Sequence, residues 1–223
     1  MSGLPARPVV LPSLMSADML RLGEQLDALI AAGTTAVHVD VMDASFVPNL
    51  TVGPDWTRAI AGPVREAGGT VDVHLMVSRP GEVIGLFAPF ADAITVHVEA
   101  DPHPHRLLGA IRDAGCAAGL ALNPGTPVEH VAELAAELVY VNVLAVNPGF
   151  AVQSFIRSTP GRVQRLRGLL PSTVRIEVDG GIGRETLPEV LAAGATMFVS
   201  ASSIFSAPDP IAAYRELAGL AEG

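Results

Sequence analysis

Eight short apolar runs, separated by longer amphipathic stretches, constrain the fold of this chain more than any other feature of its sequence. The runs are rich in valine and isoleucine, and most are followed by Pro, Gly, Asn or Asp, as buried parallel strands often are. They occupy Val9–Leu14, Ala36–Met42, Val71–Val77, Ala93–Glu99, Ala117–Asn123, Tyr140–Val146, Val174–Val178 and Met197–Ser202. We therefore expect eight parallel strands in an α/β protein.

The stretches between the runs have helical character. Three of them end in Ala-Gly, which places Gly33, Gly115 and Gly194 where a glycine commonly terminates a helix. Eight similar units favour a closed, single-domain (β/α)8 TIM barrel over residues 1–223, with no linker or domain boundary. An open, doubly wound sheet is the alternative, but no G-x-G-x-x-G follows the first strand. The helical segments include Met19–Ala32, His105–Ala114, Val128–Leu138, Glu185–Ala193 and Pro210–Ala221.

Charge excludes several classes of function. The formal net charge is -9, whereas surfaces that bind nucleic acid or anionic membranes are basic. All 14 basic residues are arginine, so a lysine Schiff base and a lysine-containing P-loop are both excluded. We expect a small-molecule substrate, with no nucleic acid and no membrane as partner.

The sequence carries one cysteine, Cys116, which cannot form an internal disulfide. A lone thiol suits a reducing compartment. The first residues lack a secretory signal, and no apolar stretch is long enough to span a bilayer. These features predict a cytoplasmic protein.

Polar side chains near three strand ends suggest a metal site, because the active site of such a barrel lies at the carboxyl ends of its strands. His38 and Asp40 are two residues apart in the second run, so their side chains point to the same side; His74 lies in the third run, and Asp179 directly follows the seventh. Two imidazoles and two carboxylates form a suitable ligand set for Zn²⁺, the expected ion, or for Fe²⁺, Mn²⁺ or Co²⁺.

Motifs from residue 11 to about residue 205 resemble, in the same order, those of the ribulose-phosphate 3-epimerase family. Two of these motifs are His38-Val39-Asp40-Val41-Met42-Asp43, at the end of the second run, and Asp72-Val73-His74-Leu75-Met76, within the third. The others are the segments 11–18, 46–49, 95–100, 121–127, 146–150, 153–155 and 177–182.

The resemblance implies roles for individual residues. His38, Asp40, His74 and Asp179 match the family's metal ligands, and the two aspartates also match its paired acid and base. Ser13 and His74 match substrate contacts. Met42 and Met76 match methionines that line the metal pocket, although both would also serve as ordinary core residues.

The implied activity is a metal-dependent epimerase reaction. It would invert C3 of D-ribulose 5-phosphate to give D-xylulose 5-phosphate through a cis-enediolate, with one aspartate on each face of the sugar. A divalent cation would stabilise the enediolate charge, and no organic cofactor is required. The family usually forms homo-oligomers, so the same is implied here.

The phosphate end departs from the family pattern. Glycines are usual where this chain has Ala151, Val152 and Ala201. One interpretation is ordinary sequence variation with phosphate binding retained. The other is a different substrate, such as allulose 6-phosphate or an unphosphorylated ketose, and a non-catalytic sugar-phosphate-binding barrel is a third alternative. The residues expected around the phosphate are Gly149, Phe150, Ala151, Val152, Gly180, Gly181, Ala201 and Ser202.

Three further polar residues have structural interpretations. His97 and Glu99 share one face of the fourth run, which predicts a hydrogen-bonded pair with no catalytic role. Asp43 differs in parity from Asp40, so we expect it to brace the loop after the second strand.

Overall fold

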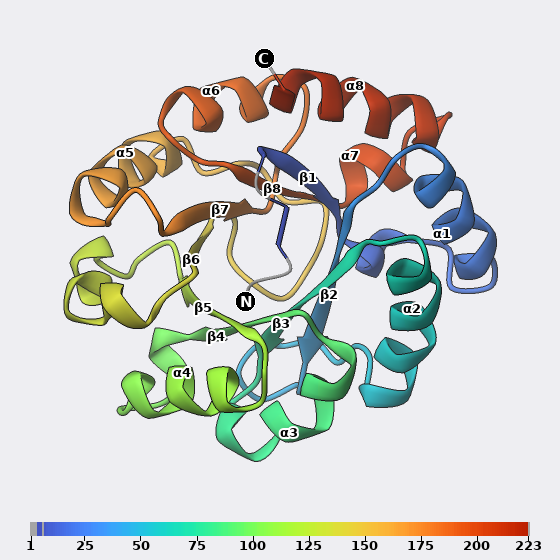
Figure 1. Cartoon of the computed structure of the whole chain (residues 1–223). Helices are drawn as coiled ribbons and strands as arrows, with labels where there is room; N and C mark the ends of the chain where they lie inside the picture. The colour runs from blue at the N-terminus through green and yellow to red at the C-terminus, as the bar shows by residue number, and fades with distance from the viewer. Residues whose placement is uncertain (1–3, 6, 223) are drawn as a thin grey trace.

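The computed structural model describes residues 4–5 and 7–222, and within them eight parallel strands form a nearly closed barrel surrounded by helices (Figure 1). The strand order is β1-β8-β7-β6-β5-β4-β3-β2, which confirms the predicted (β/α)8 barrel. The strands are β1 Val9–Pro12, β2 Ala36–Met42, β3 Thr70–Met76, β4 Ala93–His97, β5 Ala117–Leu122, β6 Tyr140–Leu144, β7 Arg175–Asp179 and β8 Met197–Ser200.

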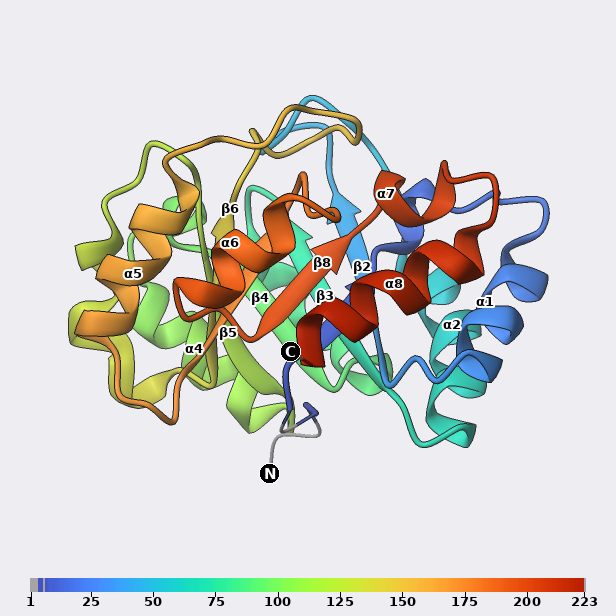
Figure 2. The same ribbon diagram turned by 90° about the horizontal axis from the view of Figure 1, so that it is seen from above.

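The helices cover the outside of the barrel (Figures 1 and 2). The α-helices are α1 Leu22–Ala31, α2 Pro54–Glu66, α3 Ile84–Phe87, α4 Pro104–Asp113, α5 Thr159–Leu169, α6 Thr186–Ala192, α7 Ser202–Phe205 and α8 Pro210–Glu222. Short 3₁₀ helices are η1 Leu14–Ser16, η2 Pro80–Glu82, η3 Ala88–Phe90, η4 Val98–Ala100 and η5 Val128–Glu137. No described helix has the length and apolar character needed to cross a membrane.

Side-chain alternation along the strands divides the core in two. Residues such as Val37, Val39 and Val41 of β2 face outward and pack with the helices in the larger cluster. A smaller cluster, including Leu11 and Met197, faces the barrel axis. The inward positions of β2 near its carboxyl end carry polar residues, so the barrel axis becomes polar toward the mouth.

Backbone hydrogen bonds join all but one of the neighbouring pairs of described strands around the barrel. Seven neighbouring strand pairs form parallel ladders, from β1–β8 round to β2–β3. Among the described residues, β1 and β2 share no ladder, and an isolated bridge between Ser13 and His38 links these two sides. We call this place the seam.

Two elements of the structure differ in detail from those predicted from the sequence. The segment predicted as a helix over Val128–Leu138 is the 3₁₀ helix η5, and its buried residues Val128, Val131 and Leu134 recur every three positions, which matches the 3₁₀ repeat. The fourth strand ends at His97, so Glu99 lies in η4 and not on a strand face.

Candidate metal centre and active site

The carboxyl ends of three strands bring four predicted ligands together. His38 and Asp40 come from β2, His74 from β3 and Asp179 from the last position of β7. The parallel register sets Asp40 directly beside His74. Both histidines are completely buried, whereas the Asp179 side chain keeps 13% of its surface exposed.

The distances between these groups suit one cation. Nε2 of His38 lies 3.4 Å from Oδ1 of Asp40 and 3.8 Å from Oδ2 of Asp179. Nδ1 of His74 lies 3.7 Å and 3.4 Å from the same two oxygens. A tetrahedral ion with bonds of about 2.0–2.1 Å separates its ligand atoms by roughly 3.3–3.4 Å. The spacing therefore fits a four-coordinate divalent metal.

Two unpartnered nitrogens support this fit. Nε2 of His38 and Nδ1 of His74 are buried and have no hydrogen-bond partner among the described residues. Buried polar atoms are rarely left in this state. Both atoms face the two carboxylates, which makes the centre of the cluster the natural place for a positive ion.

Electrostatics in the metal-free protein point the same way. Burial opposes charge on His38, but the Asp40 and Asp72 carboxylates raise its pKa above the ordinary value. Burial likewise opposes charge on His74, and nearby Asp179 and Asp40 raise its pKa. Burial would raise the pKa of Asp40, yet His38 and His74 lower it. The cluster therefore attracts positive charge, for which protons and a metal ion compete.

Behind His38 lies a hydrogen-bonded chain that we call the inner arm, formed by Asp72, Tyr140 and Thr95. Nδ1 of His38 is 2.7 Å from Oδ2 of Asp72, and the Tyr140 hydroxyl donates to Oδ1 of Asp72 at 2.5 Å. The Thr95 hydroxyl donates to Tyr140 at 2.5 Å. All four residues are completely buried. Burial, and then the Asp72 charge, raise the pKa of Tyr140, which remains a hydroxyl donor.

Behind His74 lies a second chain, the outer arm, formed by His97, Glu99 and Thr126. The Nε2 atoms of His74 and His97 are 2.9 Å apart, and Nδ1 of His97 is 3.1 Å from Oε2 of Glu99. The other Glu99 oxygen accepts hydrogen bonds from the backbone N–H of Asn123 and from the Thr126 hydroxyl. The predicted pairing of His97 with Glu99 is confirmed. The contact of His97 with His74 was not predicted.

The pKa values within the outer arm favour a neutral imidazole beside an ionised carboxylate. Burial lowers the pKa of His97 to about 4, despite the Glu99 carboxylate. Burial would raise the pKa of Glu99, but hydrogen bonds from His97, Thr126 and the Asn123 amide lower it to about 2.

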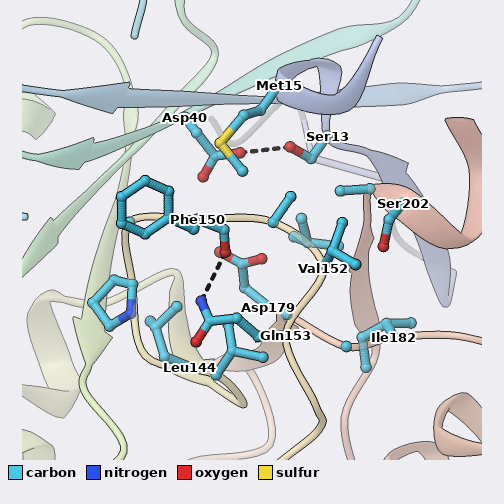
Figure 3. A pocket seen from close by; sticks show the side chains of 18 of the residues that line it. Ser13, Met15, Asp40, Leu144, Phe150, Val152, Gln153, Asp179, Ile182 and Ser202 are labelled. Carbon is cyan, nitrogen blue, oxygen red and sulfur yellow. Dashed lines mark hydrogen bonds between the residues drawn. The ribbon is translucent and has the colours of Figure 1, made fainter. Parts of the chain in front are cut away.

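Asp40 has a second partner on the pocket side. The Ser13 hydroxyl donates to Oδ2 of Asp40 at 2.5 Å, so the two carboxylate oxygens face different groups (Figure 3). Met42 and Met76 line the pocket and belong with Val47 to a small apolar cluster. In this part of the pocket, the Asp40 carboxylate is held by the Ser13 hydroxyl and lies beside apolar side chains.

The residues expected around the phosphate surround the same pocket. The loops after β2 and β6 lie side by side above it (Figure 2), joined by a 2.7 Å hydrogen bond from the Asn49 amide to the Gly149 carbonyl. His38 and His74 lie beneath the pocket with no exposed surface, although His74 was also predicted to contact substrate. The predicted residues that line the pocket are Ser13, Gly149, Phe150, Ala151, Val152, Gly180, Gly181, Ala201 and Ser202.

Backbone conformation differs among the positions where glycine would be expected. Val152 has φ 60° and Ala44 has φ 58°, so both adopt the left-handed conformation without being glycine. This conformation is unfavourable for β-branched Val152, whose residue surface is 83% exposed at the pocket rim. Ala201 has φ -111° and carries no such strain.

Substitution of the two glycines after β7, Gly180 and Gly181, would be more disruptive. A Cβ on Gly180 would lie 2.3 Å from a methyl carbon of Val146, and a Cβ on Gly181 would lie 3.0 Å from the Phe155 backbone. Their positive φ values, 99° and 64°, add to the requirement for glycine. The backbone here can approach a ligand closely.

Asp43 braces the loop after β2, as predicted. Its carboxylate accepts hydrogen bonds from the backbone amides of Ser45, Phe46 and Ser78. Burial would raise the pKa of Asp43, but these amides lower it. Asp43 lies outside the cluster of four candidate ligands.

Sequence reasoning did not assign the residues that hold the histidines. Asp72 lies two residues before His74 in the third run and so shares its strand face, but its contact with His38 depends on the lateral register that pairs Asp72 with His38. Tyr140 reaches Asp72 across the barrel interior. The available signal was a carboxylate, a hydroxyl and an imidazole at inward strand positions, where buried polar groups require partners.

Comparisons with known proteins agree along the chain. Residues 9–205 match the model of the "Ribulose-phosphate 3 epimerase family". A ribulose-phosphate 3-epimerase of Rhodobacter capsulatus is 45% identical over 201 residues, which cover 88% of this chain and 85% of the relative. That of Escherichia coli K12 is 42% identical over 207 residues, covering 90% of each chain.

Solved structures support the fold alone. A Mycobacterium tuberculosis tryptophan synthase structure superposes with a TM-score of 0.71 at 17% identity, covering 97% of this chain and 93% of the other. At this level of identity the likeness establishes barrel architecture and carries no information about the reaction.

Proposed function

This chain belongs to the ribulose-phosphate 3-epimerase family and is an epimerase of carbohydrate metabolism, and from this premise we propose that it interconverts D-ribulose 5-phosphate and D-xylulose 5-phosphate by inverting C3. The observation that carries the proposal is the convergence of two unpartnered imidazole nitrogens on two carboxylate oxygens. This arrangement combines a divalent-cation site with two proton-handling groups.

Asp40 and Asp179 are proposed as the acid and base. They come from β2 and β7, and both line the pocket (Figure 3). Inversion requires one group to remove the C3 proton and another to return a proton to the opposite face. The Ser13 hydroxyl holds Asp40 by its second oxygen, which fixes that carboxylate relative to the bound sugar.

His38, Asp40, His74 and Asp179 would hold the cation, and we propose Zn²⁺, with Fe²⁺, Mn²⁺ and Co²⁺ as alternatives. When bound, a divalent ion supplies Lewis acidity that stabilises the negative charge of a cis-enediolate. Elemental analysis of the purified protein identifies the ion, and an equimolar content of one transition metal is the expected result.

The phosphate is proposed to bind at the neutral rim of the pocket. Among the described residues, no Lys, Arg or His side chain lines this pocket. A phosphate would therefore depend on backbone N–H groups near Gly180, Gly181 and Ala201 and on the Ser202 hydroxyl. Gly149, Phe150, Ala151 and Val152 would close over it from the loop after β6.

The strained Val152 makes substrate identity a separate question. With the phosphate at this rim, the Val152 side chain would narrow the space beside it, so allulose 6-phosphate and an unphosphorylated ketose are the alternative substrates. Comparing kcat/KM across these sugars decides among them. Ribulose 5-phosphate is expected to give the highest value, and Val152→Gly tests how far the side chain restricts longer sugars.

Proton exchange tests the reaction itself. The metal-loaded protein is expected to introduce solvent deuterium at C3 of ribulose 5-phosphate, as followed by NMR in D₂O. Asp40→Asn and Asp179→Asn should each lower the rate by about 10²–10⁴-fold, the usual contribution of a positioned acid or base. Asp55→Asn, on an exposed part of α2, is the matched control.

The outcomes separate the hypotheses. Exchange at the wild-type rate in both active-site variants would remove the assignment of the two aspartates. Ribulose 5-phosphate binding without exchange in the wild-type protein would favour the non-catalytic sugar-phosphate-binding barrel.

We further propose a homo-oligomer in the cytoplasm. The lone, buried Cys116 suits a reducing compartment, and the family resemblance supports self-association. Light scattering of the purified protein measures its mass directly, and a value near 23.0 kDa would rule out the oligomer under the conditions used.

A further inference from the structure

The outer arm forms a continuous line from the proposed metal centre to the loop after β5. The ring planes of His74 and His97 lie within 18° of parallel, and the ring centroids are 4.9 Å apart. The two Nε2 atoms face each other at 2.9 Å, and both residues are completely buried. Such a contact is favourable only when one of the two nitrogens carries a proton and the other is bare.

The metal centre fixes which nitrogen carries that proton. If Nδ1 of His74 presents its lone pair to a cation, the ring's proton must sit on Nε2. It is then donated to Nε2 of His97, which must be bare. A neutral His97 consequently carries its own proton on Nδ1 and donates it to Glu99, whose carboxylate lies 3.1 Å away. Every hydrogen bond in the line then has one donor and one acceptor.

The far end of the line is held in place by the fold. Glu99 accepts two further hydrogen bonds, from the Asn123 amide and the Thr126 hydroxyl. The carbonyl oxygens of those same two residues accept hydrogen bonds from the Arg162 guanidinium, at 2.8 Å and 3.0 Å. Arg162 is itself only 5% exposed. Glu99 is therefore anchored on both sides of its carboxylate.

We propose that Glu99, acting through His97, is a positioning residue that selects the form of His74 protonated on Nε2 and thereby presents Nδ1 to the metal. The inference rests on the metal centre of the proposed function. This role is more specific than holding the loop after β5 in place. A carboxylate can only accept the His97 proton, whereas a neutral amide side chain at the same place could also donate, and so would not fix which nitrogens of His97 and His74 are protonated.

A simple loop brace is the competing interpretation, since Glu99 also ties down residues 123–126. The two roles differ in how they depend on His97. A directing role reaches the metal only through the imidazole, whereas a loop brace acts independently of it. A double-mutant cycle between the two positions separates these cases.

The experiment measures Co²⁺ affinity by chelator competition, together with the Co²⁺ absorption spectrum, for the wild-type protein, Glu99→Gln, His97→Gln and the double variant. Glu99→Gln should weaken Co²⁺ binding by about 10–100-fold, as expected for the loss of an outer partner of a histidine ligand. The glutamine in His97→Gln offers an amide oxygen to Nε2 of His74. In that background, Glu99→Gln should change affinity by less than about twofold.

Two further variants control for charge and for the loop. Glu82→Gln removes an exposed carboxylate paired with Arg79, and it should leave Co²⁺ binding unchanged. Thr126→Val removes the loop's hydroxyl donor to Glu99 but keeps the His97–Glu99 bond, so it should weaken Co²⁺ binding less than Glu99→Gln does, whereas a loop brace predicts a comparable loss. Circular dichroism of each metal-free variant verifies that it is folded.

The results distinguish a failure of the directing role of Glu99 from a failure of the proposed metal centre. Equal losses of affinity from Glu99→Gln in both backgrounds, or a loss below twofold in the wild-type background, would overturn the directing role. If the wild-type protein bound no Co²⁺, the proposed metal centre itself would fail, and the inference with it.

Discussion

The inner arm and the outer arm orient two histidines in the same cluster, but they are built into different parts of the molecule. Asp72, Tyr140 and Thr95 have no exposed surface and lie inside the barrel, where Tyr140 also belongs to the axial core cluster. The outer arm leaves the barrel at His97, and the Glu99 side chain is 25% exposed. One arm is part of the core, and the other ends in a loop.

This difference indicates how closely each arm ties metal binding to folding. A defect in the inner arm leaves buried polar groups without partners, so it should lower both stability and metal affinity. A defect in the outer arm can be partly compensated by water at the loop. It should lower metal affinity with a smaller effect on stability.

The strongest test of the comparison is Asp72→Ala. The change removes the acceptor for both the His38 imidazole and the Tyr140 hydroxyl, each buried. We expect the unfolding free energy of the metal-free protein to fall by about 3–5 kcal/mol, as measured by urea denaturation. A loss below about 1 kcal/mol would show that the inner arm is not part of the stabilising core.

Gly119→Ala tests the same arm by crowding it. A Cβ here would lie 2.4 Å from Cζ of Tyr140 and 2.6 Å from the Thr95 hydroxyl oxygen. The expected loss is about 1–3 kcal/mol of unfolding free energy. Gly109→Ala in α4 is the control, since no described atom outside its chain neighbours and the backbone of its own helix lies within 4 Å of the added methyl, and it should stabilise the helix by about 0.5–1 kcal/mol.

The contribution of the outer arm to the free energy of unfolding should depend on pH. The pKa of Glu99 is about 2 in the folded protein and near 4.5 for an ordinary glutamate. Because the folded-state pKa is lowered, the stabilisation is fully present above pH 4.5 and is lost as pH falls toward 2. The stability difference between the metal-free wild-type protein and Glu99→Gln should therefore shrink below pH 4.5. A difference independent of pH from 5.5 to 3 would contradict this assignment.

Thr126→Val should have the smallest effect. It removes one hydrogen bond at the partly exposed end of the outer arm, so thermal unfolding should reveal a loss of no more than about 0.5 kcal/mol. A loss comparable to that of Asp72→Ala would mean that the outer arm is as deeply coupled to folding as the inner one, and the comparison would fail.

The fold was largely readable from the sequence because parallel strands buried on both faces give continuous apolar runs. The end of β2 at Met42 was predicted as observed, and the parity of that run placed His38 and Asp40 on one side. By contrast, no bounds were predicted for α2. It contains Gly62 and Pro63, which weaken the helical pattern although Pro63 lies in its last turn.

The contacts behind the ligands could not be obtained in this way. Parity along one strand does not fix the lateral register, which decides that Asp72 lies beside His38. The pairing of His74 with His97 depends on two ring orientations, for which a sequence carries no direct signal. Likewise, the positive φ of Val152 is a property of the folded loop, since residues of its type rarely adopt that conformation.

The seam has a consequence for the motions of the whole barrel. Ser13 and His38, which bridge β1 to β2 there, also contact Asp40 and Asp72. The Ser13–Asp40 hydrogen bond therefore joins the carboxyl end of β1 to β2 at the one place where two neighbouring described strands share no ladder, and a cation bound by Asp40 should stiffen this part of the barrel. Amide hydrogen exchange along β1 and β2 is where that stiffening would register first.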